Sequence, residues 1–166
     1  MIRAEKRGFR MRIIVDAFGG DNAPLEMIKG AQLARQEYGV DVILCGESEK
    51  IQSCAKENGL DLNGLEILEA EGMIPVEADP TTLLKDYENC SMAVGLRMLA
   101  EGQGDAFVSA GSTGALLMGA TFLVKRIAGI SRPALGAVLP SDTHPFMPTD
   151  MGANADCRPE MLLQFA

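Results

Sequence analysis

The fold is decided by the stretch RIIVDAFGGDNAP, residues Arg12–Pro24. Its first five residues form a β-branched run typical of a buried strand, and Gly19-Gly20 then predicts a tight turn. Pro24 suits the first turn of a helix, and the apolar residues between it and Gly39 keep a helical spacing. Strand, glycine turn and helix in this order are the start of a βαβ unit.

The same alternation continues along the chain. Beyond the strand 12–16 and the helix that ends near Gly39, we predict the following elements: strands over 40–45, 65–68, 105–109, 134–139 and 150–153, helices over 47–58, 82–101, 113–127 and 159–165, and a loop over 71–80. The predicted strands are apolar throughout, which is typical of a parallel sheet covered on both faces. The sequence therefore predicts an α/β fold with a mostly parallel sheet.

Composition and charge narrow the possible functions. The chain has 166 residues, of which 47% are apolar and 23% charged, as in a folded domain. Its net charge of −8 lacks the basic footprint of a nucleic-acid-binding protein. The exception is residues 1–10, which carry four basic side chains and one acidic one. We interpret them as a basic N-terminal tail before a domain that spans 11–166.

The sequence shows no pattern typical of a metal or cofactor site. The four cysteines form no CxxC pair, so we expect free, buried thiols. Neither a Walker A loop nor a GxGxxG fingerprint is present, so a nucleotide site has little support. We expect no metal and no cofactor.

Three glycine-rich segments follow predicted strands, where ligands bind in α/β sheets. They are Asp16–Pro24, Ser109–Ala115 and Asp150–Asp156. In the second, glycines let the backbone approach an anion, and the free N–H groups at a helix start favour negative charge. The hydroxyls of Ser112 and Thr113 could donate further hydrogen bonds, or one of them could simply cap the helix with nothing bound.

For the charged side chains near these segments, structural roles are simpler explanations than ligand binding. For Asp16 and Asp21 we favour structural or orienting roles, because carboxylates repel an anion. Arg126 and Arg132 lie around the C-terminal end of the predicted helix 113–127, where cations complement the helix dipole. His144, the only histidine, is expected to be an exposed loop residue.

Four blocks together resemble a known family: VDAFGGDNAP (15–24), SAGSTGALL (109–117), GISRPAL (129–135) and DMGANAD (150–156). In order and spacing they are similar to the PlsX phosphate acyltransferases of bacterial phospholipid synthesis. That family usually has Met at position 18 and Asn at position 112, where this chain has Phe18 and Ser112. Its members are roughly twice as long, so the resemblance covers their N-terminal half.

The resemblance implies a three-layer α/β/α fold related to isocitrate and isopropylmalate dehydrogenases. It implies transfer of a fatty acyl group from acyl carrier protein to inorganic phosphate, giving acyl phosphate for phospholipid synthesis. It also implies a cytoplasmic homodimer that attaches peripherally to the inner face of the membrane, with the attachment expected from the other half.

On this reading, the phosphate and substrate are held by residues of the glycine-rich segments. These are Gly19, Gly20, Asp21, Ser109, Gly111, Ser112, Thr113, Gly114, Gly152, Asn154 and Asp156. No catalytic residue is assigned. A bulky residue at Gly111 is expected to abolish phosphate-dependent turnover while leaving the fold largely intact.

Three alternatives stay open. The chain could be a short-chain phosphate acetyl- or butyryltransferase that uses acyl-CoA. It could be a non-catalytic half that binds an anion or a partner and would be inactive alone. A dehydrogenase of the related fold has the least support, because no dinucleotide fingerprint is present.

Overall fold

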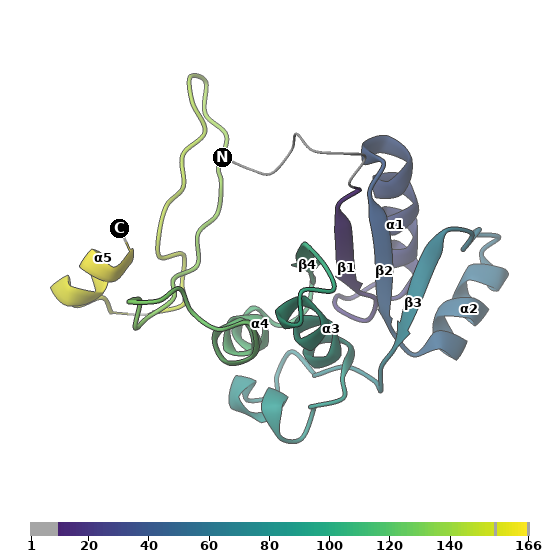
Figure 1. The fold of residues 1–166 in the computed structure, drawn as a ribbon, viewed down its shortest axis with the longest axis horizontal. Coiled ribbons are helices and arrows are strands. Elements are labelled where there is room, and N and C mark those ends of the chain that lie inside the picture. Colours follow the sequence, from purple (N-terminus) through teal and green to yellow (C-terminus); the bar gives the residue numbers. More distant parts are fainter. Residues whose placement is uncertain (1–9, 155, 166) are drawn as a thin grey trace.

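The computed structural model describes residues 10–154 and 156–165. Apart from Arg10, the predicted basic tail lies outside these residues. The elements follow the predicted alternation in the first two-thirds of the chain (Figure 1). In chain order they are β1 (Arg12–Asp16), α1 (Leu25–Tyr38), β2 (Asp41–Gly46), α2 (Ser48–Glu57), β3 (Leu65–Glu69), the 3₁₀ helix η1 (Pro80–Leu84), α3 (Ser91–Ala100), β4 (Ala106–Val108), α4 (Thr113–Gly119), the π-helical turn η2 (Ala120–Val124) and α5 (Pro159–Phe165).

The described residues form one four-stranded sheet in the order β3-β2-β1-β4, and every neighbouring pair is parallel. Helices α1 and α2 cover one face, and α3 covers the other (Figure 1). The predicted α/β class and the three-layer arrangement are therefore confirmed. The carboxyl ends of β1 and β4 lie side by side, because Val15 is in register with Val108.

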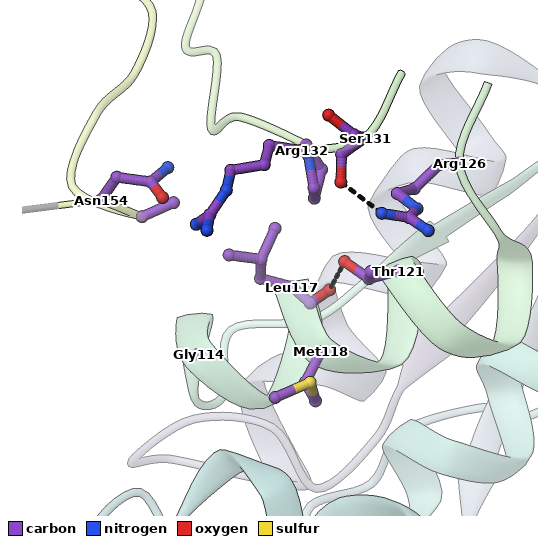
Figure 2. A pocket seen from close by; sticks show the side chains of 10 residues that line it. Gly114, Leu117, Met118, Thr121, Arg126, Ser131, Arg132 and Asn154 are labelled. Atoms are coloured by element: carbon purple, nitrogen blue, oxygen red, sulfur yellow. Dashed lines mark hydrogen bonds between the residues drawn. The ribbon is translucent and has the colours of Figure 1, made fainter. Parts of the chain in front are cut away.

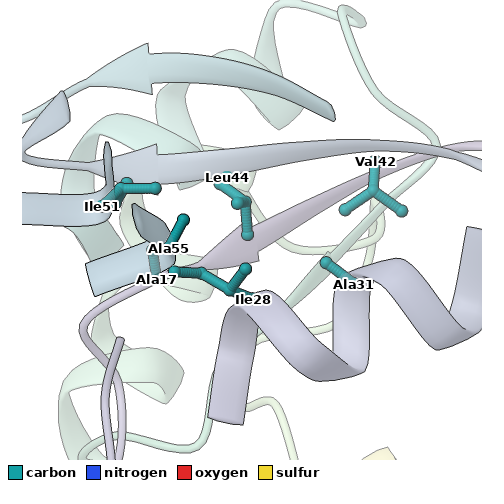
Figure 3. Packing of buried hydrophobic residues seen from close by; sticks show 7 residues of the cluster. All are labelled: Ala17, Ile28, Ala31, Val42, Leu44, Ile51 and Ala55. Carbon is teal, nitrogen blue, oxygen red and sulfur yellow. The ribbon is translucent and has the colours of Figure 1, made fainter. Parts of the chain in front are cut away.

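Strand β2 shows why the predicted strands are apolar throughout. Val42 and Leu44 pack against Ile28 of α1 and Ile51 of α2 (Figure 3). Successive side chains of a strand point to opposite faces, so Ile43 packs on the α3 side instead. The side chains that meet on the first face are almost fully buried: Val42, Leu44, Ile28 and Ile51. Strand β2 therefore has no solvent-facing side on which a polar residue could be placed.

The predicted helix over 82–101 is wrong in its first half. Asp79 caps η1 by accepting hydrogen bonds from the Thr81 amide at 2.8 Å and the Thr81 hydroxyl at 2.7 Å. These bonds also hold the pKa of Asp79 below its usual 3.8. The chain then turns until Cys90, whose extended backbone starts α3. The predicted helix 113–127 is also interrupted, because α4 passes into η2 and ends before Lys125, which has φ +74°.

The predicted strands over 134–139 and 150–153 do not join the sheet. Residues 134–151 instead form an antiparallel hairpin that projects away from the domain (Figure 1), here called the hairpin arm. Leu139 and Phe146 exchange backbone hydrogen bonds of 2.8 and 3.0 Å, and the Met151 amide donates to Leu135 at 2.9 Å. The apolar pattern of these residues correctly indicated extended backbone. The extended segments, however, pair with each other and not with the sheet.

The hydrophobic core stops early in the chain. Within the described residues, no buried apolar side chain follows Ala115. Large apolar side chains on η2, the turn after it, the hairpin arm and α5 are exposed instead: Phe122, Val124, Ile127, Val138, Phe146, Met147, Met151, Leu162 and Leu163. The last third of the chain is therefore held by hydrogen bonds and partial contacts rather than by a core. In the part of the chain that the structure describes, no helix is long and apolar enough to cross a bilayer.

Candidate functional site

The loops after β1 and β4 are joined through Asp16. Its carboxylate, only 2% exposed, accepts hydrogen bonds from the Ser109 hydroxyl at 2.7 Å and the Phe18 amide at 3.1 Å. The Ser109 oxygen in turn accepts a bond from the Gly111 amide at 3.1 Å. Asp16 thus orients both loops, as the sequence favoured, and the hydroxyl of Ser109 is occupied within the protein.

This close contact leaves no room for a side chain at Gly19 and little room for one at Gly111. A Cβ at Gly19 would lie 2.6 Å from both the Asp16 carboxylate and the Ser109 hydroxyl. A Cβ at Gly111 would lie 3.4 Å from the Gly19 Cα and 3.3 Å from the Met92 side chain. A bulky residue at Gly111 would therefore disturb packing as well as any bound anion, so this substitution does not isolate phosphate binding.

The Ser112 side chain serves as the N-cap of α4. Its backbone is extended, with φ −60° and ψ +116°, and its hydroxyl accepts a hydrogen bond from the Ala115 amide at 3.3 Å. The Ser112 hydroxyl therefore caps the helix, which is one of the two roles that the sequence left open for it. Thr113 is exposed as the first residue of α4, and Gly114 faces a cavity.

This cavity of about 310 Å³, here called the inner cavity, lies beside α4 and η2 (Figure 2). Parts of three of the four resemblance blocks meet in it. Its lining residues are Gly114, Leu117, Met118, Thr121, Arg126, Ser131, Arg132, Pro133, Ala153 and Asn154. Gly114 and Asn154 are the predicted site residues that the fold brings together here, from segments about 40 residues apart.

Two arginines of the inner cavity were not among the predicted site residues. Arg132 extends over Leu117 toward Asn154 (Figure 2), and it has no carboxylate within 4 Å among the residues described. Arg126 donates a hydrogen bond to the backbone carbonyl of Ser131. The sequence placed both at a helix terminus, but η2 ends before them and the chain turns back over α4. The position of Arg132 within the GISRPAL block (129–135) was the available signal, and Arg126 lies outside that block.

A second cavity of about 890 Å³, here called the outer cavity, continues from the inner one toward α5. Both cavities share Ser131, Arg132, Ala153 and Asn154, so Arg132 stands at their junction. The remaining lining residues are Asp156, Arg158, Glu160, Met161 and Gln164. The Gln164 side chain fixes α5 to this region, since its oxygen accepts hydrogen bonds from the amide and hydroxyl of Ser131 at 2.7 and 2.9 Å.

Asp150 organises the loop that carries Asn154. Its carboxylate accepts hydrogen bonds from the amide of Leu135 at 2.8 Å, the amide of Ala153 at 3.3 Å, and the backbone and side-chain nitrogens of Asn154 at 2.7 and 2.8 Å. Desolvation raises the pKa of Asp150, but these hydrogen bonds outweigh it and hold the pKa below its usual 3.8. Asp150 thereby ties both ends of the hairpin arm together and orients Asn154.

Replacing Asp150 with asparagine is expected to loosen this loop, because an amide nitrogen cannot accept the bonds from Asn154. Amide hydrogen exchange at Leu135 and Asn154 should be faster in the variant. Because the folded-state pKa is lowered, the wild-type loop should keep its protection as pH falls to about 3.8 and lose it only below that value. The substitution Asp142→Asn, at an exposed carboxylate of the hairpin arm, serves as the control. Unchanged exchange at both amides would contradict the assigned role of Asp150.

The other predicted site residues occupy two places. Gly19, Gly20, Ser109 and Gly111 belong to the joined loops after β1 and β4, where Gly20 has φ +115°, and Asp21 is exposed on the same loop.

On the third segment, Asp156 lines the outer cavity, and Gly152 lies in the turn before Asn154 with φ +99°. His144 is exposed at the tip of the hairpin arm and lines neither cavity.

All four cysteines are free thiols, but only Cys45 and Cys90 are buried, while Cys54 is half-buried and Cys157 exposed. Burial, the nearby carboxylate of Asp16 and the Cys90 thiol raise the pKa of Cys45 to about 12. Burial also raises the pKa of Cys90. Neither buried sulfur is an activated nucleophile at neutral pH. Among residues 10–154 and 156–165, no three His, Cys, Asp or Glu side chains are grouped to hold a metal ion.

Comparison with solved structures bears on the fold. A phosphotransacetylase from Streptococcus pyogenes superposes with a TM-score of 0.72 and 20% identity, covering 95% of this chain and 52% of that one. The EutD phosphotransacetylase from Staphylococcus aureus gives a TM-score of 0.68, again at 20% identity, covering 93% and 50%. These similarities show a shared α/β fold.

Curated sequences give closer relatives. The chain is 42% identical over 157 residues to the phosphate acyltransferase of Desulforamulus reducens, covering 94% of this chain and 46% of that protein. It is 43% identical to the phosphate acyltransferase of Caldicellulosiruptor bescii, covering 94% and 47%. The chain thus spans about half the length of the curated relatives it matches. A family model described as "Fatty acid synthesis protein" matches residues 11–166, and the chain belongs to this family.

Proposed function

We propose that this chain carries the phosphate-binding part of an acyl-carrier-protein:phosphate acyltransferase. The observation that carries the proposal is the Arg132 guanidinium, which lies in the cleft beside Asn154 without a carboxylate partner among the described residues. A guanidinium fork matches the oxygens of phosphate, and its charge stabilises negative charge on a reacting group. The relatives' shared name, phosphate acyltransferase, supports the same reading.

In the proposed reaction, hydrogen phosphate lies in the inner cavity against Arg132. A phosphate oxygen attacks the carbonyl carbon of the acyl thioester, the new C–O bond forms, and the C–S bond breaks. The proton of hydrogen phosphate ends on the departing thiolate, so the products are acyl phosphate and a free thiol. A thioester is already activated, so positioning of phosphate and stabilisation of the developing oxyanion supply the catalysis.

The joined loops would shape the other side of this site. Asp16 and Ser109 hold the β4–α4 loop in place, which fixes the direction of the Gly114 backbone at the cavity. Asp150 holds Asn154, whose amide faces the same cavity (Figure 2). Our proposal therefore assigns Arg132, Gly114 and Asn154 to the phosphate, and Asp16 and Asp150 to positioning.

Acyl carrier protein as donor, a homodimer, and a cytoplasmic location with peripheral contact to the membrane's inner face stay predictions from the resemblance. No nucleic-acid partner is proposed, in line with the net charge of −8. Size-exclusion chromatography with light scattering checks the dimer.

Phosphate-dependent release of thiol from a long-chain acyl-acyl carrier protein tests the proposal. We expect acyl phosphate to form with this donor and not with acetyl-CoA, and we expect inorganic phosphate to shift the Arg132 Nε–H signal in NMR spectra. Turnover with acetyl-CoA alone would instead support a short-chain enzyme. Phosphate binding without turnover would support a non-catalytic anion-binding chain. This alternative is favoured by the lack of buried apolar side chains after Ala115 in the described residues, because the segment around the inner cavity then has no core of its own. Failure of phosphate to affect Arg132 would overturn the assignment of the site.

A further inference from the structure

Ser131, the residue before Arg132, has all of its polar groups bonded within the protein. Its amide and hydroxyl donate to the side-chain oxygen of Gln164 at 2.7 and 2.9 Å. Its carbonyl accepts a hydrogen bond from Arg126. Because the proposed phosphate ligand follows directly in the chain, the position of Ser131 decides where the backbone of Arg132 begins.

Only one of these partners ties Ser131 to a distant part of the chain. Arg126 is five residues away, so its bond closes a turn without fixing that turn to another element. Gln164 is 33 residues away on α5. Within residues 10–154 and 156–165, its two bonds are the only hydrogen bonds that join α5 to a segment before residue 156. None of the described side chains of α5 is buried, so the docking of this short helix depends on Gln164.

On its other side, Arg132 is held by the chain itself. Pro133 fixes its own φ and restricts the residue before it to extended backbone. Two residues further on, the amide of Leu135 donates to the Asp150 carboxylate at 2.8 Å. Arg132 therefore lies between two anchored points, and the anchor toward α5 rests on the side chain of Gln164.

On the basis of the proposed function, we infer that Gln164 is a positioning residue for the phosphate: it holds Ser131, and through Ser131 it keeps the Arg132 guanidinium at the junction of the two cavities. Gln164 lines the outer cavity, whereas Arg132 and Asn154 also line the inner cavity, where the phosphate is proposed to lie. Gln164 thus acts without touching the phosphate. Holding Arg132 before the phosphate arrives lowers the cost of ordering its long side chain on binding.

Thermodynamic linkage makes the effect of Gln164 reciprocal. Because docked α5 favours phosphate binding at Arg132, bound phosphate favours docked α5 by the same factor. Inorganic phosphate should therefore slow amide hydrogen exchange in α5 of the wild-type chain, and it should not do so in Gln164→Leu. A side chain that only stabilised α5 would not make these exchange rates respond to phosphate. Exchange in α5 of the wild type that does not change with bound phosphate would contradict the coupling.

Binding of inorganic phosphate to the full 166-residue chain and its variants tests the inference. Gln164→Leu removes the acceptor at similar side-chain size, and it should fold because no described side chain of α5 is buried. We expect the dissociation constant for phosphate to rise about fivefold or more, since two hydrogen bonds that favour the binding-competent arrangement are lost. In an Arg132→Gln background, the same substitution should cause no further loss, because Gln164 acts through Arg132. Leu163→Ala, on the same helix and 78% exposed, should leave the affinity unchanged.

Motion of the Arg132 backbone amide, measured by NMR relaxation without phosphate, tests the anchor by itself. The motion should increase in Gln164→Leu and not in Gln164→Glu, whose carboxylate still accepts both bonds. Unchanged motion in Gln164→Leu would overturn the inference.

The Arg132 Nε–H signal of the wild type separates failure of the inference from failure of the proposed function. If phosphate shifts this signal and Gln164→Leu binds phosphate as tightly as the wild type, only the inference is wrong. If phosphate leaves the signal unshifted while the Arg132 amide is more mobile in Gln164→Leu, the proposed phosphate site is wrong and the positioning of Arg132 by Gln164 is supported.

Discussion

Phosphate-dependent turnover is expected to fall about 10²–10³-fold when Arg132 is replaced by glutamine, the effect of removing one preorganised donor from a transition state. Glutamine keeps much of the length and loses the charge and the two-pronged fork. Among the described residues, Arg132 is the only cation that lines both cavities, and the other arginine of the inner cavity, Arg126, is bonded to the Ser131 carbonyl. Steady-state rates over a range of phosphate concentrations measure the loss.

Two further variants give the Arg132 result its meaning. Arg132→Lys keeps the charge without the fork and should fall between wild type and Arg132→Gln. Arg10→Gln changes an exposed arginine that pairs with the Asp41 carboxylate at 3.6 Å, and its activity should equal that of the wild type. If Arg132→Gln folds normally and retains wild-type turnover, the phosphate does not lie against Arg132. If the unsubstituted chain shows no turnover, its affinity for inorganic phosphate is compared with the affinities of the same variants instead.

Leu44→Ala should lower the free energy of unfolding by about 2–5 kcal/mol, the range for large-to-small substitutions in a core. Leu44 is fully buried in the middle strand between β1 and β3, and it packs against both α1 and α2 (Figure 3). The cavity left by the lost atoms cannot collapse easily, because a strand paired on both sides has little freedom to move. Urea denaturation followed by circular dichroism measures the change.

Leu163→Ala is the matched control, since it deletes the same atoms from a side chain that is 78% exposed on α5. We expect a change within about 0.5 kcal/mol, as for other surface substitutions. This pair of variants also tests where the core ends. A loss at Leu163 comparable to that at Leu44 would mean that the last third of the chain is buried in solution, in conflict with the exposure described here.

The first two-thirds of the fold could be predicted because its signals are local. Arg12–Asp16 and Val42–Cys45 are apolar runs bounded by glycines and charges, and each is followed by a helical spacing. A strand buried on both faces leaves this pattern whatever its neighbours are. The break between η1 and α3 was missed because Cys90 starts a second helix within the single stretch of helical spacing over 82–101.

The candidate site was only partly predictable. Two of the glycine-rich segments contribute Gly114 and Asn154 to the same cavity, although the segment that carries Asn154 does not follow a strand of the sheet. They also drew attention to Gly19 and Gly111, whose lack of a side chain is explained by contact between two loops. The cation that completes the cavity, Arg132, lies in the resemblance block 129–135 but in none of the glycine-rich segments, and only the path of the chain after η2 brings it back over α4.

By itself, the sequence determined the α/β class, the parallel strands and the segments from which the site is built. It did so because apolar periodicity and glycine placement follow from backbone geometry, which acts over a few residues. The tertiary structure alone decided that residues 134–151 pair with each other rather than with the sheet, and that Arg132 rather than Ser112 offers a free polar group to a ligand. Those outcomes depend on which distant groups already satisfy one another's hydrogen bonds and charges, and no local pattern records that.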